Sequence, residues 1–201
     1  MATVAEVVNA LRAGRPVIIP TDTVYGLCAS PFREADVRRL YRLKGRRESQ
    51  PTALLCADVG MLFECVPTLR GRAGKIASAL LPGPYTLIFS NPDRVYRWMT
   101  GSRPDTIGVR VPLLKGDAAA VLGEVGAVAA TSANEIGGPD PRVLDDVPEA
   151  MRAGAAAVLD GGELPGTPST ILDFTAKEPR VLREGAASSA RALERVRAVV
   201  G

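Results

Sequence analysis

The 201-residue sequence contains no histidine, few aromatic residues and only three cysteines. The absence of histidine excludes Ser-His-Asp and Cys-His catalysis, histidine-ligated zinc, and imidazole as a general acid or base. Aromatic residues make up only 4% of the chain, so stacking of many bases on exposed rings is not expected as the main activity. Any chemistry must therefore use carboxylates, Lys, Arg, hydroxyls, backbone amides or a borrowed metal ion.

The three cysteines, Cys28, Cys56 and Cys65, form no C-x-x-C pair and lie in or beside apolar runs. A sparse, odd-numbered set of this kind favours small core residues in a reducing compartment over a disulfide framework. No apolar run approaches the length of about 18 residues that a membrane-spanning helix needs, and the N-terminus has no signal-like pattern. We therefore expect a cytoplasmic protein with no membrane partner.

Neither basic nor acidic residues are in large excess, because the chain has 25 basic and 22 acidic residues and a net charge of +3. A dedicated nucleic-acid-binding protein usually carries a larger basic excess. Arginine outnumbers lysine 21 to 4, which codon usage in a GC-rich genome explains for most positions. Only the arginines that belong to a motif are therefore treated as candidates for function.

Helical and strand patterns alternate along the whole chain, without a composition break, a repeat or a low-complexity tract. Helices are expected at 4–13, 34–43, 58–65, 70–80, 117–124, 146–153 and from Ser188 or Ser189 onward. Strands are expected at 16–20, 52–56, 86–90, 107–111, 127–131, 156–159, 170–174 and 180–183. This alternation predicts a single α/β domain over residues 1–201, with a central sheet covered by helices.

The two common phosphate-binding motifs are missing. No G-x-G-x-x-G follows a strand, and the sequence from Gly71 to Lys75 continues with Ile76 and lacks the P-loop spacing. A nucleotide, if bound, must therefore be held in another way.

Polar segments instead lie at or near the ends of expected strands, at 20–27, 44–51, 106–112, 131–134 and 166–171, with a weaker one at 181–185. Each segment alone is explained equally well as an ordinary turn or a solvated charged loop. Arg110 is different, because it interrupts an apolar strand and a lone buried arginine costs several kcal/mol. One polar cleft that collects phosphate and carboxylate groups explains all the segments more simply than separate turns do.

Seven motifs follow one another within residues 4–185. They are Pro20-Thr21-Asp22-Thr23-Val24-Tyr25-Gly26-Leu27, Lys44-x-Arg46, Leu81-Pro82-Gly83-Pro84-x-Thr86, Thr106-Ile107-Gly108-Val109-Arg110-x-Pro112, Ser132-x-Asn134, Pro168-Ser169-Thr170-Ile171-x-Asp173 and Leu182-Arg183-x-Gly185. In this order they resemble the motifs of the YrdC-like threonylcarbamoyl-AMP synthase family. The resemblance implies a twisted, open, mixed sheet flanked by helices, with a central polar cleft. It corresponds to the short form of the family, without the extra C-terminal domain.

The resemblance also implies an activity. Members of this family form threonylcarbamoyl-AMP and pyrophosphate from L-threonine, bicarbonate or CO2, and ATP, for threonylcarbamoyladenosine modification of tRNA next to the anticodon. The implied cofactor is Mg2+ bound through the ATP phosphates, and the implied partners are the downstream proteins that transfer the threonylcarbamoyl group to tRNA. Weak binding of tRNA or double-stranded RNA is a further implied property.

The implied site residues fall into two groups. Carried over from the family, the threonine contacts are Thr23, Arg110, Ala130 and Ser169. The implied ATP contacts are Lys44, Arg46, Gln50, Thr106, Ser132, Asn134, Asp140 and Arg183, of which Lys44 and Arg46 are assigned a catalytic role.

The chain departs from the family pattern near the Lys-x-Arg loop. It has Gln50-Pro51-Thr52 where many members have Lys or Asn followed by Pro-Leu, and Leu55 where a histidine is common. Two alternatives therefore stand beside the synthase. One is a YciO-like paralogue that acts on a related carbamoyl-adenylate, and the other is a double-stranded RNA-binding module of the same fold.

Overall fold

The computed structural model describes residues 1–200 of the chain. Its strands are β1 (Val17–Pro20), β2 (Tyr25–Ala29), β3 (Ala53–Cys56), β4 (Tyr85–Ser90), β5 (Thr106–Arg110), β6 (Ala127–Ser132), β7 (Ala157–Val158), β8 (Thr170–Asp173) and β9 (Arg180–Arg183). Its α-helices are α1 (Val4–Arg12), α2 (Glu34–Lys44), α3 (Val59–Cys65), α4 (Gly71–Leu80), α5 (Gly116–Val125), α6 (Glu149–Gly154) and α7 (Ser189–Val200). Short 3-10 helices are η1 (Arg97–Met99) and η2 (Leu144–Asp146).

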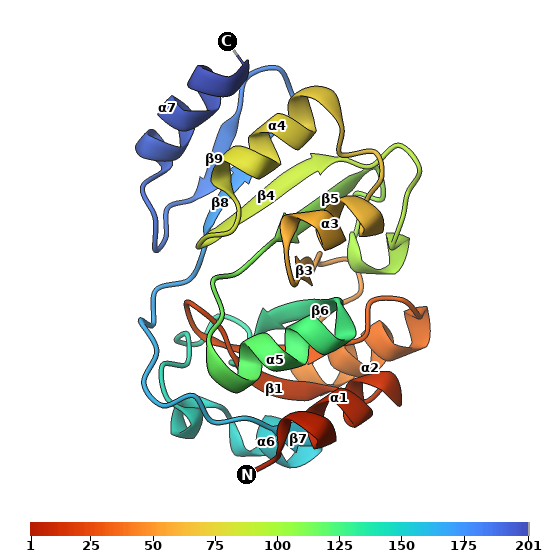
Figure 1. The fold of residues 1–201 in the computed structure, drawn as a ribbon. Helices are drawn as coiled ribbons and strands as arrows, with labels where there is room; N and C mark the ends of the chain where they lie inside the picture. The colour runs from red at the N-terminus through yellow and green to blue at the C-terminus, as the bar shows by residue number, and fades with distance from the viewer. Residues whose placement is uncertain (201) are drawn as a thin grey trace.

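The strands form one open mixed sheet in the order β7-β1-β2-β6-β3-β5-β4-β8-β9. The pairs β1–β7, β3–β5 and β4–β8 are parallel, and the other neighbouring pairs are antiparallel. Helices flank this sheet, with α1 and α5 in the lower half of Figure 1 and α4 and α7 at the top. The expected α/β class, with an open mixed sheet flanked by helices, is confirmed.

The helices cover the two faces of the sheet unequally. The larger core lies on one face, where α2, α3, α4 and α7 pack against it. On the other face, α1 and α5 bury residues of only one half of the sheet, including Ile19, Cys28 and Val128. The helices of this second core therefore leave uncovered the half of that face formed by β5, β4 and β8.

The register of the strands determines which residues lie on this uncovered part of the face. Leu55 on β3, which belongs to the core under α1 and α5, is paired with Arg110 on β5. Paired residues of neighbouring strands point to the same face, and every second residue of a strand does so too. The uncovered face therefore carries Thr106, Gly108 and Arg110 from β5 instead of the apolar Ile107 and Val109, which are buried in the larger core.

Most expected elements are confirmed to within a few residues, but strand β2 was missed. Thr21 forms the expected hydroxyl-stabilised turn, since its Oγ accepts hydrogen bonds from the amides of Thr23 and Val24, both at 3.2 Å. This turn leads into β2, which pairs antiparallel with β1, and does not lead into a helix. Tyr25 and Gly26, which belong to the polar segment 20–27, lie in this buried strand, in which Gly26 opposes Ile19.

The helix expected at 146–153 begins later. Residues 144–146 form η2, and Pro148 is the N-cap of α6, which begins at Glu149. The expected start at residue 146 was therefore wrong, because the carboxylate of Asp146 accepts hydrogen bonds from the amides of Arg142 and Val143 within the preceding turn.

All three cysteines are buried and free, as expected from their apolar surroundings. Among residues 1–200, no helix combines the length and the apolar character that crossing a membrane requires.

Candidate active site

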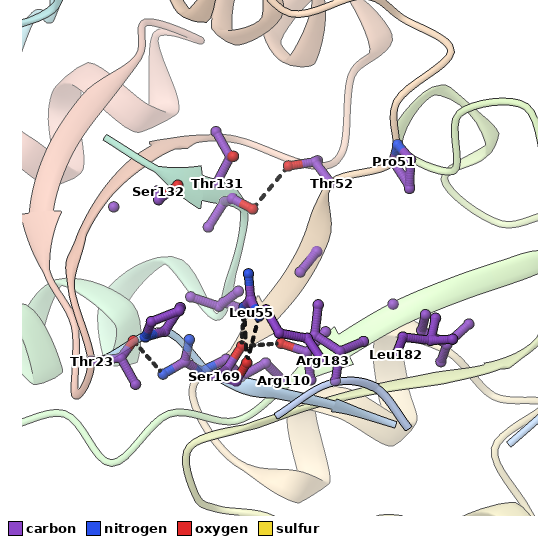
Figure 2. Close-up of a pocket in the computed structure, with 18 of the residues that line it drawn as sticks. Thr23, Pro51, Thr52, Leu55, Arg110, Thr131, Ser132, Ser169, Leu182 and Arg183 are labelled. Carbon is purple, nitrogen blue, oxygen red and sulfur yellow. Dashed lines mark hydrogen bonds between the residues drawn. The ribbon is translucent and has the colours of Figure 1, made fainter. Parts of the chain in front are cut away.

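The uncovered part of the sheet forms the floor of a cavity of about 370 Å³. Residues of β2, β3, β4, β5, β6, β8 and β9 line it, together with the loops that follow β1, α2, η1 and β6 and the segment just before β8 (Figure 2). Nine of the site residues implied by the sequence lie around this one cavity: Thr23, Arg46, Thr106, Arg110, Ala130, Ser132, Asp140, Ser169 and Arg183. Polar segments that are far apart in the sequence therefore meet in one place.

Arg110 lies at the end of the cavity near the turn between β1 and β2. Its Nη2 atom forms an ion pair with Asp22 and donates a hydrogen bond of 3.0 Å to the hydroxyl of Thr23. The side chain is only 8% exposed, and its Nε atom is buried without a hydrogen-bond partner among residues 1–200. A guanidinium at the wall of a cavity is suited to bind a carboxylate or phosphate oxygen.

Arg46 reaches the opposite wall of the cavity from the loop after α2. Its Nη1 atom donates to the hydroxyl of Thr131 at 3.1 Å, and its Nη2 atom donates to the carbonyl of Pro51 at 2.6 Å. Its Nε atom, like that of Arg110, is buried and lacks a partner among the described residues. The guanidinium is thus held by neutral oxygens and keeps its full positive charge.

Arg183 enters the cavity from the edge strand β9. Its Nε and Nη2 atoms donate to the carbonyl of Ser169 at 3.0 and 2.8 Å. The Ser169 hydroxyl lies 2.8 Å from the hydroxyl of Thr86 on β4. Figure 2 shows Arg183, Ser169 and Arg110 along one side of the cavity, with Thr131, Ser132 and Thr52 along the other. Anions bound between these sides would meet donors from both.

Burial lowers the pKa of all three arginines, because it removes water from their charged form. Asp22 offsets part of this effect at Arg110, and Asp140 offsets part of it at Arg183. The positive charge of Arg183 adds to the lowering at Arg110, so the two guanidinium groups repel each other across the cavity wall. An anion in the cavity would relieve both the desolvation and the repulsion.

Lys44, Gln50 and Asn134 do not line the cavity. Lys44 is 7% exposed, and its ammonium donates to the side-chain oxygen of Asn134 at 2.7 Å and to the carbonyl of Ser132 at 2.8 Å. Gln50 accepts a 3.3 Å hydrogen bond from the backbone amide of Arg47, within its own loop. The implied ATP contacts of these three residues therefore stay predictions.

Several polar residues of the cavity were not selected from the sequence. Thr52, Thr86, Thr131 and Arg103 line it, and Asp22 holds Arg110 from behind. Asp22 stands in the first motif and was available as a signal, whereas Arg103 comes from a loop with no motif. Leu55, the position where a histidine was expected from the family, forms an apolar part of the wall.

The cavity offers little to hold a metal ion by itself. Within the part of the chain that the structure describes, no group of three or more His, Cys, Asp and Glu residues is placed to hold one. Asp140 is the only carboxylate among the described lining residues. This donor set fits Mg2+ that is carried by the phosphates of a nucleotide, since Mg2+ keeps several waters and accepts one or two protein carboxylates.

An open mixed α/β sheet with a cavity lined by several arginines is suited to binding anionic small molecules. Comparison with known proteins makes this class specific. The family profile Sua5/YciO/YrdC, described as "Telomere recombination", matches residues 9–185. The chain therefore belongs to the Sua5/YciO/YrdC family.

Two sequence relatives illustrate the match. A protein of Mycobacterium leprae, provisionally named a threonylcarbamoyl-AMP synthase, is 34% identical over 192 residues, which cover 95% of this chain and 86% of the relative. The threonylcarbamoyl-AMP synthase of Pyrococcus abyssi is 33% identical over 192 residues, which cover 95% of this chain and 55% of the relative. The chain thus spans most of the first relative and about half of the second.

Solved structures agree with this assignment. The crystal structure of P. abyssi Sua5 complexed with L-threonine superposes with a TM-score of 0.86 at 32% identity, covering 98% of this chain and 58% of that chain. Escherichia coli YciO superposes with a TM-score of 0.80 at 24% identity, covering 92% of this chain and 90% of that chain, and supports the fold alone.

Proposed function

We propose that this protein is a threonylcarbamoyl-AMP synthase, a nucleotidyltransferase that forms threonylcarbamoyl-AMP and pyrophosphate from L-threonine, bicarbonate and ATP. The product would serve the threonylcarbamoyladenosine modification of tRNA. The observation that carries the proposal is the convergence of Arg46, Arg110 and Arg183 on one cavity. The names of the sequence relatives and the L-threonine bound by a structural neighbour point to the same substrates.

The proposed reaction joins two anions. The threonine amine and bicarbonate give a carbamate and water. A carbamate oxygen then bonds to the α-phosphorus of ATP, and the bond between this phosphorus and the bridging oxygen breaks to release pyrophosphate. The main barrier is the repulsion of carboxylate and phosphate, so catalysis depends on positioning and on neutralising charge. A cavity with several arginines and no histidine matches this demand.

The first group of residues would bind the amino acid. Arg110, which lines the cavity, would donate to the threonine carboxylate, and Thr23 and Ser169 line the same side of the cavity. The carbonyl of Ala130 is already the acceptor of a 2.8 Å hydrogen bond from the Thr52 hydroxyl. A second hydrogen bond from the substrate amine to this carbonyl is compatible, because a carbonyl oxygen has two lone pairs.

The second group would bind ATP. Arg46 and Arg183 would donate to its phosphates, and Thr106 and Ser132 add hydroxyls in the cavity. Asp140 lies at the same cavity and would bind a water of the phosphate-bound Mg2+. When bound, Mg2+ would neutralise phosphate charge, as it does in other phosphoryl-transfer enzymes.

The test is pyrophosphate release from ATP in the presence of L-threonine and bicarbonate, with each of the two omitted in turn. Release that needs both supports the proposal, and the product is then identified by mass spectrometry. Release without threonine, or no release with all components present, would contradict it. Salt-sensitive binding of double-stranded RNA without pyrophosphate release would indicate the RNA-binding module instead.

A further inference from the structure

Asp22 compensates the charge of one arginine of the cavity and leaves the charges of the other two uncompensated. One of its carboxylate oxygens forms the ion pair with Arg110, and the other accepts a 3.1 Å hydrogen bond from the amide of Leu113. Both side chains of the pair are almost fully buried, at 8% exposure for Arg110 and 10% for Asp22. The charge of Arg110 is therefore compensated within the protein, in surroundings where water screens little.

The half-buried Arg46 and the more exposed Arg183 are not compensated in this way. Arg46 donates only to a hydroxyl and a carbonyl, and Arg183 donates only to the carbonyl and hydroxyl of Ser169. Among residues 1–200, neither has a carboxylate within 4.0 Å of its guanidinium. Both keep a net charge of +1 at the cavity, where Asp140 contributes a weaker, longer-range attraction to Arg183.

This difference matters because the proposed reactants differ in charge. A triphosphate gains most from net positive charge, whereas an amino acid has one carboxylate and gains most from a correctly aimed donor. Arg110 with Asp22 offers guanidinium donors at the cavity wall but no net charge. Arg46 and Arg183 offer both.

We propose that Asp22 is a specificity-determining residue that reserves the Arg110 end of the cavity for a carboxylate and excludes phosphate from it. The inference rests on the proposed function, since it concerns where the two anionic reactants bind. Without the Asp22 carboxylate, Arg110 and Arg183 would form a pair of net charge +2 on one wall. Such a pair is a phosphate site, and ATP or pyrophosphate would then occupy the place of the amino acid.

The same carboxylate also positions Arg110. It links the turn between β1 and β2 to the segment after β5, because its two oxygens contact Arg110 and the amide of Leu113. A neutral amide at this position keeps oxygen and nitrogen atoms in place but removes the charge. Asp22→Asn therefore separates the electrostatic effect from the loss of contacts.

The experiment measures equilibrium binding of L-threonine by calorimetry, with and without saturating inorganic pyrophosphate. In the wild-type protein, pyrophosphate is expected to change the threonine dissociation constant by less than about twofold. In Asp22→Asn, pyrophosphate should compete and raise this constant by about tenfold or more, because it gains the uncompensated charge of Arg110 beside that of Arg183. Equal competition in both proteins, or competition in neither, would overturn the inference.

Asp145→Asn is the matched control, because it removes the same charge from a side chain that is 93% exposed and outside the cavity. It should behave like the wild type. Asp22→Ser is a second neutral variant if circular dichroism shows that Asp22→Asn does not fold. Failure of the proposed function would appear separately, as absence of threonine-dependent pyrophosphate release in the wild type.

Discussion

The ammonium of Lys44 donates a 2.7 Å hydrogen bond to the side-chain oxygen of Asn134. It lies at the end of α2, while Asn134 lies in the loop after β6. Ser132, whose carbonyl accepts a second hydrogen bond from Lys44, lines the cavity. Lys44 and Asn134 therefore hold the loop that presents Ser132, through contacts that span about 90 residues of sequence.

Lys44 should make stability depend on pH. Burial, with a smaller contribution from Arg46, lowers its pKa from 10.5 to about 8. Between these pH values the unfolded chain binds more protons than the folded one, so the free energy of unfolding rises with pH; below about pH 8 the cost of burying the charge is fully present. Urea unfolding from pH 7 to 10 should show this rise in the wild type relative to Lys44→Met. Parallel curves for the two proteins would contradict it.

Arg110→Ala should impair the use of threonine far more than the use of ATP. Loss of a charged donor to a carboxylate costs about 1.5–3 kcal/mol, which corresponds to a rise of about ten- to a hundredfold in the KM for threonine. The KM for ATP should change little. Steady-state pyrophosphate release with each substrate varied tests this, and Arg12→Ala, at an exposed ion pair, is the control. Equal losses for both substrates would refute the assignment.

Arg46→Ala should show the opposite split. Arg46 keeps its net charge at the wall formed by Thr131 and Pro51, so its loss should raise the KM for ATP by about tenfold or more and leave that for threonine nearly unchanged. Arg47→Ala is the matched control, because Arg47 is exposed in the same loop and does not line the cavity. The same kinetic assay provides the readout. An effect of Arg47→Ala as large as that of Arg46→Ala would indicate a general role of loop charge.

Gly101 holds two loops of the cavity wall together. Its φ is +63°, and a Cβ atom there would lie 2.8 Å from the backbone nitrogen of Pro51 and even closer to the carbonyl oxygen of Ser49. Gly101→Ala should therefore destabilise the protein by about 1–3 kcal/mol and also weaken ATP binding, because Arg46 donates to Pro51 in the displaced loop.

Gly123→Ala is the control for this change, measured by urea unfolding of both variants. Gly123 lies in α5, where an added Cβ meets no atom within 4 Å, so alanine should raise stability by up to about 1 kcal/mol. Stability of Gly101→Ala equal to that of the wild type would show that the two loops are not tightly joined.

The pattern of apolar and polar residues was sufficient to predict most of the fold. Strand β5 is an example, because its apolar residues alternate with Thr106, Gly108 and Arg110. The missed strand β2 shows the limit of this signal. Its glycine and aromatic residue follow a turn directly, and only the pairing with β1 on one side and β6 on the other makes this segment a strand.

The sequence by itself determined which residues carry charge and hydroxyl groups, and that these stand at the ends of strands. Arg110, an arginine inside an apolar strand, could be recognised as functional from its position alone, because burying an isolated charge is costly. Only the tertiary structure decided which polar groups satisfy one another. Asp22 compensates Arg110 across 88 residues, and Lys44 turns to Asn134 instead of the cavity. Such pairings depend on distances of a few ångströms between segments, and local sequence patterns do not encode those distances.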